Sequence, residues 1–206
     1  ELHTDLGVVE IPEDVQSGDS LESHLGEAFQ VHALRGPDLF NHLERTGAPM
    51  MPRDIGLVVG HTGAAAGDRV LDAGTGTGIL AAYLGRLGAD VTTYEIDAAF
   101  AEVARDNMEV AGVADRVDVR TGDITDKIDD LTGGEPFDLL TLDTEDAPEV
   151  VADAADLLAP GGFLAVYSPF IENSRASVEA AEAAGLAAIE TVETIQRELT
   201  VDDRGT

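Results

Sequence analysis

Three glycines, Gly74, Gly76 and Gly78, alternate with small residues between an apolar strand pattern and an apolar helix pattern. Glycines in such a turn let the backbone approach a ligand closely, and the free N–H groups of the following helix suit a carboxylate. The third glycine of a dinucleotide fingerprint would stand where the chain has Ile79, and the Gly-Lys-Ser/Thr of a P-loop is missing from this turn. The loop therefore predicts a nucleotide-like ligand at the carboxyl end of a parallel strand.

Two acidic residues end the next two predicted strands. Glu95 follows the second strand, where its carboxylate can accept both ribose hydroxyls of an adenosine. Asp123 follows the third strand, where it can accept a hydrogen bond from the adenine amine, with Ile124 against the ring. Because consecutive parallel strands end at one edge of a sheet, we expect the glycine loop and both acids to share one crevice. NAD stays an alternative, since Glu95 would also suit its ribose.

Strands alternate with helices from Asp68 onward, and this pattern is typical of a parallel sheet covered on both faces. We predict strands over 69–72, 90–95, 117–121, 137–142, 163–168 and 188–199, and helices over 37–45, 54–61, 80–87, 100–110 and 174–184. Pro160-Gly161-Gly162 is expected to form the turn before the strand at 163–168. Near the N-terminus, 7–11 and 28–32 are predicted as short strands.

The predicted fold class is α/β, with a mostly parallel, doubly wound, Rossmann-like sheet and a small N-terminal β module. We place the β module at 1–33, linking helices at 34–66, and the ligand-binding Rossmann-like domain at 67–206.

The charge of the chain is extreme, with 41 acidic residues against 12 Lys and Arg and a net charge of −29. An apolar content of 44% and regular periodicity argue against disorder. We therefore predict a protein adapted to molar salt, where the Debye length falls to about 3 Å and self-repulsion is screened. The same salt weakens long-range attraction to phosphates, so the acidity does not decide against an RNA substrate.

Composition also excludes several kinds of site. The chain has no cysteine, which removes disulfides, thiolate metal sites and cysteine nucleophiles. The five histidines lack metal-ligand spacing, so no metal site is predicted; they are His3, His24, His32, His42 and His61. No apolar run reaches the roughly 18 residues of a membrane span, and the N-terminus does not resemble a signal peptide. The expected location is the cytoplasm.

The chain resembles the tRNA (adenine-N1)-methyltransferases of the archaeal and bacterial TrmI type. The resemblance rests on Glu1-Leu2-His3-Thr4 with Gly7-Val8, on Met51-Pro52-Arg53-Asp54-Ile55-Gly56, on Ala73-Gly74-Thr75-Gly76-Thr77-Gly78, on Tyr94-Glu95-Ile96, and on Ser168-Pro169-Phe170-Ile171-Glu172-Asn173. The glycine loop alone is common to many methyltransferases. Its combination with the segments at Met51 and Ser168 is much more specific.

The resemblance implies a class I methyltransferase that uses S-adenosylmethionine (SAM), releases S-adenosylhomocysteine and methylates N1 of adenine in the T-loop region of tRNA. It also implies a homotetramer. The implied cofactor-binding residues are Gly74, Thr75, Gly76, Thr77, Gly78, Glu95, Ile96, Asp123 and Ile124.

Three positions depart from the family pattern. Met51 replaces the usual tyrosine, which removes an aromatic contact to the target base, and Asn173 replaces glutamine. The segment Leu142–Pro148 keeps the first aspartate of the family's Leu-Asp-Leu-Pro-Asp-Pro loop but alters its prolines. An earlier N-terminal segment and a closing strand of the family are not found, so we expect a chain truncated at both ends.

Adenine N1 carries a lone pair and needs no deprotonation, so the chemistry asks for alignment and for stabilisation of a cationic product. Asp143, at the tip of the fourth strand, is the candidate that accepts a hydrogen bond from the adenine N6 amine. Its alternative role is to cap the helix near Ala147, although Asp146 is better placed for that. Tyr167 can stack on a flipped base or pack under the sheet edge.

Two other functions stay open on the sequence. One is a small-molecule methyltransferase of the corrinoid-pathway type, against which the β-rich start and the Met51 segment argue. The other is a SAM-binding subunit without catalysis, against which the retention of Asp143 argues. An Asn/Asp-Pro-Pro-Tyr/Phe motif, typical of enzymes that methylate exocyclic amines, does not occur at Asp143.

Overall fold

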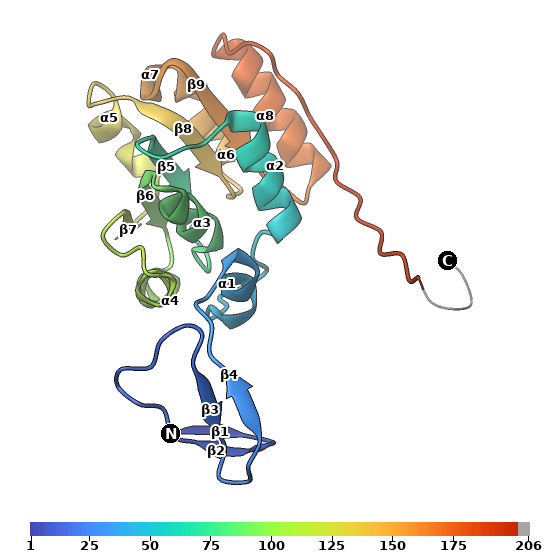
Figure 1. Ribbon diagram of the computed structural model, residues 1–206. Helices are drawn as coiled ribbons and strands as arrows, with labels where there is room; N and C mark the ends of the chain where they lie inside the picture. Colours follow the sequence, from blue (N-terminus) through green and yellow to red (C-terminus); the bar gives the residue numbers. More distant parts are fainter. Residues whose placement is uncertain (202–206) are drawn as a thin grey trace. The chain divides into compact units, whose positions relative to one another are not determined.

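The computed structural model describes residues 1–201, and the last five residues of the predicted domain lie outside the described part. The chain divides into two compact units, Glu1–Asn41 and His42–Thr206. In the first unit, strand β1 (Leu2–Thr4) pairs antiparallel with β2 (Gly7–Val9), and β3 (Ser20–Glu22) pairs antiparallel with β4 (Ala28–Gln30) (Figure 1).

The two hairpins of the first unit are joined by a bridge between Val9 and Ser23 and by a hydrogen bond of 2.8 Å from the Val8 N–H to His24 Nδ1. Both strands predicted here exist, but they end two residues early, at Val9 and Gln30. The sequence reading missed β1 and β3, because strands of three residues carry too little alternation to be recognised. Helix α1 (Gly36–His42) follows.

The second unit alternates strands and helices. Its strands are β5 (Arg69–Ala73), β6 (Asp90–Glu95), β7 (Val117–Thr121), β8 (Phe137–Leu142) and β9 (Leu158–Val166). Its helices are α2 (Pro52–Thr62), α3 (Ile79–Leu87), α4 (Ala98–Ala111), the 3-10 turn η1 (Thr125–Lys127), α5 (Ile128–Leu131), α6 (Ala147–Ala152), α7 (Ala154–Leu157) and α8 (Ile171–Ala183).

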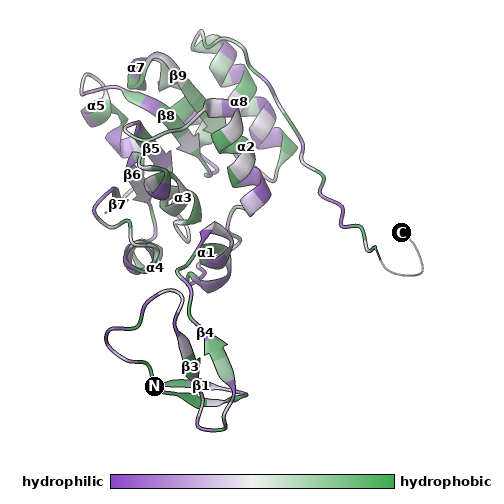
Figure 2. Cartoon of the chain, viewed as in Figure 1, coloured by the Kyte–Doolittle hydropathy of each residue, from purple (hydrophilic) through white to green (hydrophobic). Residues whose placement is uncertain are grey.

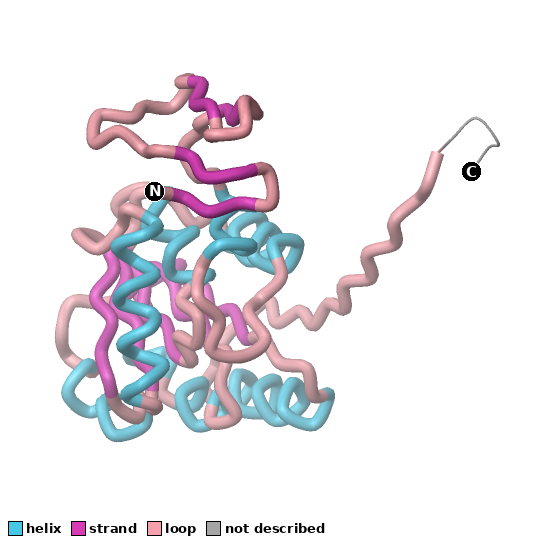
Figure 3. Tube along the Cα trace, turned by 90° about the horizontal axis from the view of Figure 1, so that it is seen from below, coloured by secondary structure: helices cyan, strands magenta, loops and turns pink. Residues whose placement is uncertain are grey.

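The five strands form one sheet in the order β7-β6-β5-β8-β9, and every neighbouring pair is parallel. Helices lie on both faces of this sheet (Figures 1 and 3). The chain order reverses at β5, since β6 and β7 lie on one side of it and β8 and β9 on the other. This arrangement confirms the predicted doubly wound α/β fold and places a switch point at the end of β5.

The core fills both faces of the sheet. On one face, helices α3 and α4 pack over β6 and β7, and Gly85 of α3 lies so close to Val113 and Val117 that a Cβ there would be 2.8 Å from the Val117 side chain. On the other face, one buried cluster joins strand residues such as Leu71 and Leu140 to helices α5 to α8. The strands are thus fixed from both sides, which holds their carboxyl ends in register.

Two predictions at the C-terminal end of the sheet are wrong. Residues 188–199, predicted as a long strand, form neither helix nor strand, and Ile195 is 83% exposed. Hydrophilic and hydrophobic residues are mixed along this segment (Figure 2), with its large apolar residues three or four positions apart rather than two. A strand also needs a neighbour for its backbone groups, and no strand in the described part of the chain pairs with it. The turn predicted at 160–162 lies inside β9, which begins at Leu158 and absorbs a register irregularity opposite Phe137.

Candidate functional site

The glycine loop leaves β5 at the switch point of the sheet and enters α3. Gly74, Gly76 and Gly78 all have positive φ angles, of 85°, 51° and 78°. A Cβ on Gly74 would lie 2.6 Å from the carbonyl carbon of Asp143 and closer still to its oxygen, so the loop can pass β8 only as glycine. The loop is therefore pressed against the residue that we predict to be catalytic.

Glu95 lies at the end of β6 and is 7% exposed. Its Oε2 accepts a hydrogen bond from the Gly76 N–H at 2.8 Å, and its Oε1 accepts one from the Asp97 N–H at 3.0 Å. Both oxygens keep a lone pair for a further donor, because a carboxylate offers about four acceptor positions. Glu95 thus aligns the glycine loop and retains acceptor capacity at its rim.

Asp123 lies after β7, where one carboxylate oxygen accepts from the Thr125 N–H at 2.9 Å and from the Thr125 hydroxyl at 2.7 Å. These two bonds lower the pKa of Asp123 below its usual value. Ile124 is 5% exposed and belongs to the core, whereas Ile96 is 67% exposed. All three line one crevice together with Gly74 and Glu95, and this is the convergence expected from the sequence; the rest of the lining is Tyr94, Gly122, Thr144 and Asp146.

The threonines of the loop face the protein. The Thr75 hydroxyl is 2.6 Å from the Thr93 hydroxyl, and Thr93 in turn donates to Asp72 Oδ2 at 2.5 Å. Thr141 donates to the other oxygen of Asp72, so this carboxylate ties β5, β6 and β8 together beneath the loop. The sequence analysis missed this role of Asp72. The available signal was an acid inside an otherwise apolar strand.

Burial raises the pKa of Asp72 above its ordinary value, against the opposing effect of the hydrogen bonds from Thr141 and Thr93. Asp143 lies near Asp72, because the Asp143 N–H donates at 2.9 Å to the carbonyl of Ala73, the residue after Asp72. Burial, and then the nearby charge of Asp72, raise the pKa of Asp143 to about 7. A half-buried carboxyl with this pKa, next in the chain to Thr144 of the crevice lining, is a candidate functional group.

Asp143 does not cap helix α6. Helix α6 begins after Asp146, and neither Asp143 nor Asp146 makes a side-chain hydrogen bond that caps it. The segment from Ser168 to Asn173 is tied to the same loop, because the Asn173 amide donates to the Glu145 carbonyl at 2.8 Å. The substituted Asn173 therefore still connects α8 to the loop after β8.

Tyr167 follows β9, and its N–H donates to the Leu142 carbonyl at 2.8 Å, next to Asp143 in the chain. Burial raises the pKa of the Tyr167 phenol, and the charges of Asp54 and Asp143 raise it further. Tyr167 and Asp143 thus lie together at the ends of neighbouring strands. Asp54, in the first turn of α2, is one of the charges near Tyr167. The sequence analysis named Asp54 only as part of the Met51–Gly56 segment that carries the family resemblance.

Asn107 of α4 is a second residue that the sequence analysis missed. Its buried amide donates at 2.9 Å to the carbonyls of both Thr77 and Glu44, and its oxygen accepts from the Glu44 N–H at 2.9 Å. It therefore clamps the glycine loop to the segment before α2. The sequence offered only a polar residue on an apolar helix face as a signal.

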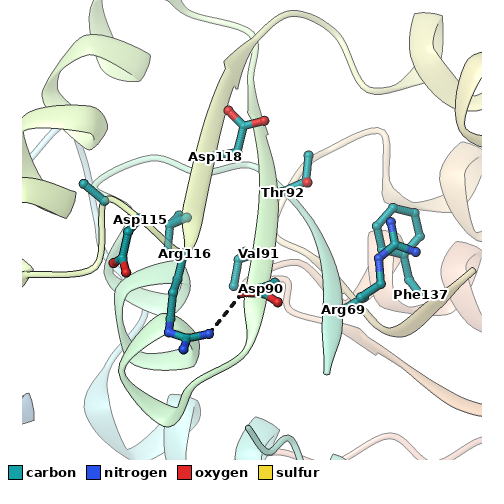
Figure 4. Close-up of a pocket in the computed structure, with 10 residues that line it drawn as sticks. Arg69, Asp90, Val91, Thr92, Asp115, Arg116, Asp118 and Phe137 are labelled. Atoms are coloured by element: carbon teal, nitrogen blue, oxygen red, sulfur yellow. Dashed lines mark hydrogen bonds and ion pairs between the residues drawn. The ribbon is translucent and has the colours of Figure 1, made fainter. Parts of the chain in front are cut away.

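A separate hollow of about 500 Å³ lies at the amino-terminal ends of β5, β6 and β7 (Figure 4). Its two guanidinium groups are already engaged, because Arg116 contacts Asp90 at 3.1 Å and Arg69 lies over the Phe137 ring. None of the residues predicted from the sequence lines it. The smaller crevice at the carboxyl ends of the strands is the candidate site, since open parallel sheets bind ligands there.

Residues 36–205 match the family described as the tRNA methyltransferase complex GCD14 subunit. The chain belongs to this family. It is also 31% identical to a tRNA (adenine(57)-N(1)/adenine(58)-N(1))-methyltransferase TrmI from Methanocaldococcus jannaschii, with 98% of this chain and 80% of that protein covered. A tRNA (adenine(58)-N(1))-methyltransferase TrmI from Thermus thermophilus is 31% identical over 81% of this chain and 65% of its own length.

Solved structures share the fold of this GCD14-family chain. A SAM-dependent O-methyltransferase from Thermotoga maritima has a TM-score of 0.81 at 23% identity, covering 98% of this chain and 77% of its own. The tRNA (m1A58) methyltransferase TrmI from Aquifex aeolicus has a TM-score of 0.66 at 18% identity, covering 84% and 78%. At these identities the likeness shows a Rossmann-like methyltransferase fold.

The crevice of the GCD14-family chain fits SAM. The turn approaches Asp143 too closely for any side chain on Gly74, and the N–H groups at the start of α3 suit the carboxylate of a methionine moiety. Glu95 and Asp123 place carboxylate acceptors at this crevice. Within the described residues, no cluster of metal-ligating side chains was found and no helix is long and apolar enough to span a membrane.

Proposed function

We propose that this chain is a SAM-dependent tRNA (adenine-N1)-methyltransferase. The observation that carries the proposal is the contact between the glycine loop and Asp143, which puts the cofactor crevice next to a carboxyl group with a pKa of about 7. Family membership and the two TrmI relatives support the choice of tRNA as substrate.

The cofactor-binding set stays as predicted from the sequence. Gly74 to Gly78 form the cradle, Glu95 accepts from the ribose, and Asp123 accepts from the adenine amine, with Ile96 and Ile124 beside the ring. Bound there, SAM supplies an electrophilic methyl group on a sulfonium. Thr75 and Thr77 act through the backbone and the buried hydroxyl network, since both side chains are buried.

Asp143 and Tyr167 form the side of the site that receives the methyl acceptor, the target adenine. The ionised Asp143 carboxylate accepts a hydrogen bond from the N6 amine of the target adenine, which raises electron density at N1 and stabilises the cationic ring as the N1–CH3 bond forms and the S–CH3 bond breaks. Tyr167 stacks on the extruded base, since a base in a folded tRNA must leave its stack at a cost of a few kcal/mol.

The test is incubation with labelled SAM and an unmodified tRNA transcript in molar KCl, followed by nucleoside analysis. The expected product is 1-methyladenosine. Label at another base position, or no label at all, would remove the proposal. Replacement of Asp143 by alanine should abolish methylation while SAM binding persists; an unchanged rate would instead favour a role without catalysis by Asp143.

We further propose that the protein works in the cytoplasm of a salt-loving cell and as a homotetramer. The net charge of −29 supports the first point and the family resemblance the second. Light scattering in molar KCl tests the tetramer, and a monomeric mass would contradict it.

A further inference from the structure

One buried hydroxyl beside the glycine loop takes no part in the hydrogen bonding of the fold. Among the described residues, Thr46 Oγ1 is the buried side-chain polar atom that has no hydrogen-bond partner. Burial without a partner costs free energy, because the hydroxyl gives up its bonds to water and receives none in return. An unpaired polar atom inside a folded chain therefore calls for an explanation, and a functional role is one of them.

The Thr46 hydroxyl faces the glycine loop. A Cβ built on Gly76 would lie 3.8 Å from Thr46 Oγ1 and 3.9 Å from the Gly74 carbonyl oxygen, and apart from the chain neighbours of Gly76 no other heavy atom would lie within 4 Å. This side of Gly76 thus has room for a carbon-sized atom in contact with both oxygens. Because Gly74 also lines the cofactor crevice, Thr46 borders the loop just beyond that lining.

The segment Glu44–Thr46 is fixed against the loop by bonds that do not involve the Thr46 side chain. The Asn107 amide donates at 2.9 Å to the carbonyls of Glu44 and Thr77. The Thr46 N–H donates to Thr77 Oγ1 at 3.4 Å. Asn107 is 3% and Thr77 is 5% exposed, so both anchors are shielded from water. The fold therefore holds Thr46 in place and leaves its hydroxyl unused.

The groups around Thr46 suit an anion. Helix α3 begins after Gly78 without a side-chain cap, and its first turn contains no acid, so its free N–H groups attract a carboxylate. Glu95 and Asp123 line the crevice itself and would repel a carboxylate there. The carboxylate of the methionine part of SAM is thus favoured on the α3 side of the loop, where the Thr46 hydroxyl can donate to it.

We propose that Thr46 is a further cofactor-binding residue, whose hydroxyl donates a hydrogen bond to the carboxylate of the methionine part of SAM. The inference rests on SAM as the cofactor of the proposed function. The bond gives the hydroxyl the partner that the fold does not supply, and a bond to a charged acceptor is stronger than one between neutral groups. Thr46 would then distinguish SAM from adenosine compounds that have no amino-acid end.

Calorimetry in molar KCl with two related ligands tests the contact. S-adenosylhomocysteine and 5′-methylthioadenosine share the adenosine and the thioether sulfur, but only S-adenosylhomocysteine has the amino-acid end. Thr46→Val replaces the hydroxyl by a methyl group, so it should weaken binding of S-adenosylhomocysteine about tenfold or more and change binding of methylthioadenosine less than about twofold. Thr46→Ser keeps the hydroxyl and should bind both ligands nearly as wild type does. The control is Thr132→Val, which removes a hydroxyl that bonds to the Ile128 carbonyl at the end of α5 and should leave both affinities unchanged.

Thermal unfolding and kinetics give two further readouts for Thr46→Val. Since Thr46 Oγ1 has no partner to lose, the variant should have a Tm without ligand that equals or exceeds that of wild type. In the methylation assay, the KM for SAM should rise about tenfold or more while kcat changes less than about twofold, because the carboxylate is bound equally in the ground state and the transition state.

The outcomes separate the two proposals. If wild type binds neither SAM nor S-adenosylhomocysteine, the proposed function fails together with its cofactor. If wild type binds both ligands of the test and Thr46→Val weakens them equally, the hydroxyl does not contact the amino-acid end and the assignment of Thr46 is refuted. A lower Tm of Thr46→Val with an unchanged affinity for S-adenosylhomocysteine would mean that the hydroxyl binds a structural water, and it would overturn the assignment as well.

Discussion

Asp143→Asn should slow methylation and yet stabilise the fold at alkaline pH. An aspartate in the unfolded chain ionises near its ordinary pKa of 3.8, whereas Asp143 in the fold has a pKa of about 7. Between these values the unfolded state has released a proton that the folded state still holds. The free energy of unfolding therefore falls as the pH rises from about 4 to 7, and the loss is complete above that range.

The size of this loss follows from the shift. About three pH units at 1.36 kcal/mol each give an upper limit of about 4 kcal/mol. Partial exposure of Asp143 and screening by salt reduce the expected value to about 1–2 kcal/mol. Asparagine cannot ionise, so the variant should gain this amount over wild type at pH 8 and almost nothing at pH 4.

The assay is thermal unfolding in molar KCl at several pH values, with Asp156→Asn, at an exposed site on α7, as the control. The expected gain for Asp143→Asn at pH 8 is about 3–6 °C in Tm. The same variant should lose about 10²-fold in methylation rate while binding SAM normally. If Asp143→Asn has the same effect on Tm at pH 4 and pH 8, the carboxyl is not buried as described, and the reasoning about its pKa is wrong.

Three further predictions concern the cradle and the charge. Gly74→Ala should abolish SAM binding, measured by calorimetry, because a Cβ there collides with Asp143; Gly133→Ala, with a φ of 82° and nothing within 4 Å, should cost only about 1–2 kcal/mol of stability and leave binding intact. Glu95→Gln should weaken SAM binding about tenfold or more by removing a charged acceptor that also holds Gly76, and an unchanged affinity would exclude it from the site. Raising KCl from about 0.2 to 3 M should raise Tm steeply through screening; a Tm independent of salt would contradict the predicted salt adaptation.

Three strands of the sheet were predictable from short local patterns. The bounds 90–95, 117–121 and 137–142 agree with β6, β7 and β8. Strand β8 is a mostly apolar, buried run, whereas the edge strand β7 alternates buried valines with exposed polar residues, and both patterns are typical of strands. The convergence of Gly74, Glu95 and Asp123 in one crevice also followed from the sequence. Parallel strands put their carboxyl ends on one edge, so position along each strand was sufficient.

The rest depends on contacts between residues far apart in the chain. Asp72 bonds to Thr141, and Asn107 bonds to Glu44. The hydrophobic periodicity of the sequence does not predict such bonds, since each depends on the tertiary packing of separate elements. The failed strand at 188–199 has the same origin. β-branched residues favour a strand there, but only a neighbouring strand supplies hydrogen-bond partners for its backbone.

The proposed role of Asp143 also bears on how a very acidic protein can methylate a nucleic acid. In the proposed mechanism the target adenine enters neutral and leaves as a cation, so the carboxylate of Asp143 would interact more strongly with the transition state than with the bound base. Asp72 beneath it and Asp54 beside Tyr167 add negative potential on the acceptor side. Burial, and then the charge of Asp72, raise the pKa of Asp143 and so weaken the fold, whereas the ionised Asp143 would favour the charge that develops on the ring. Replacing Asp143 by asparagine should therefore stabilise the protein at alkaline pH and slow the reaction together, whereas the exposed Asp156→Asn should do neither.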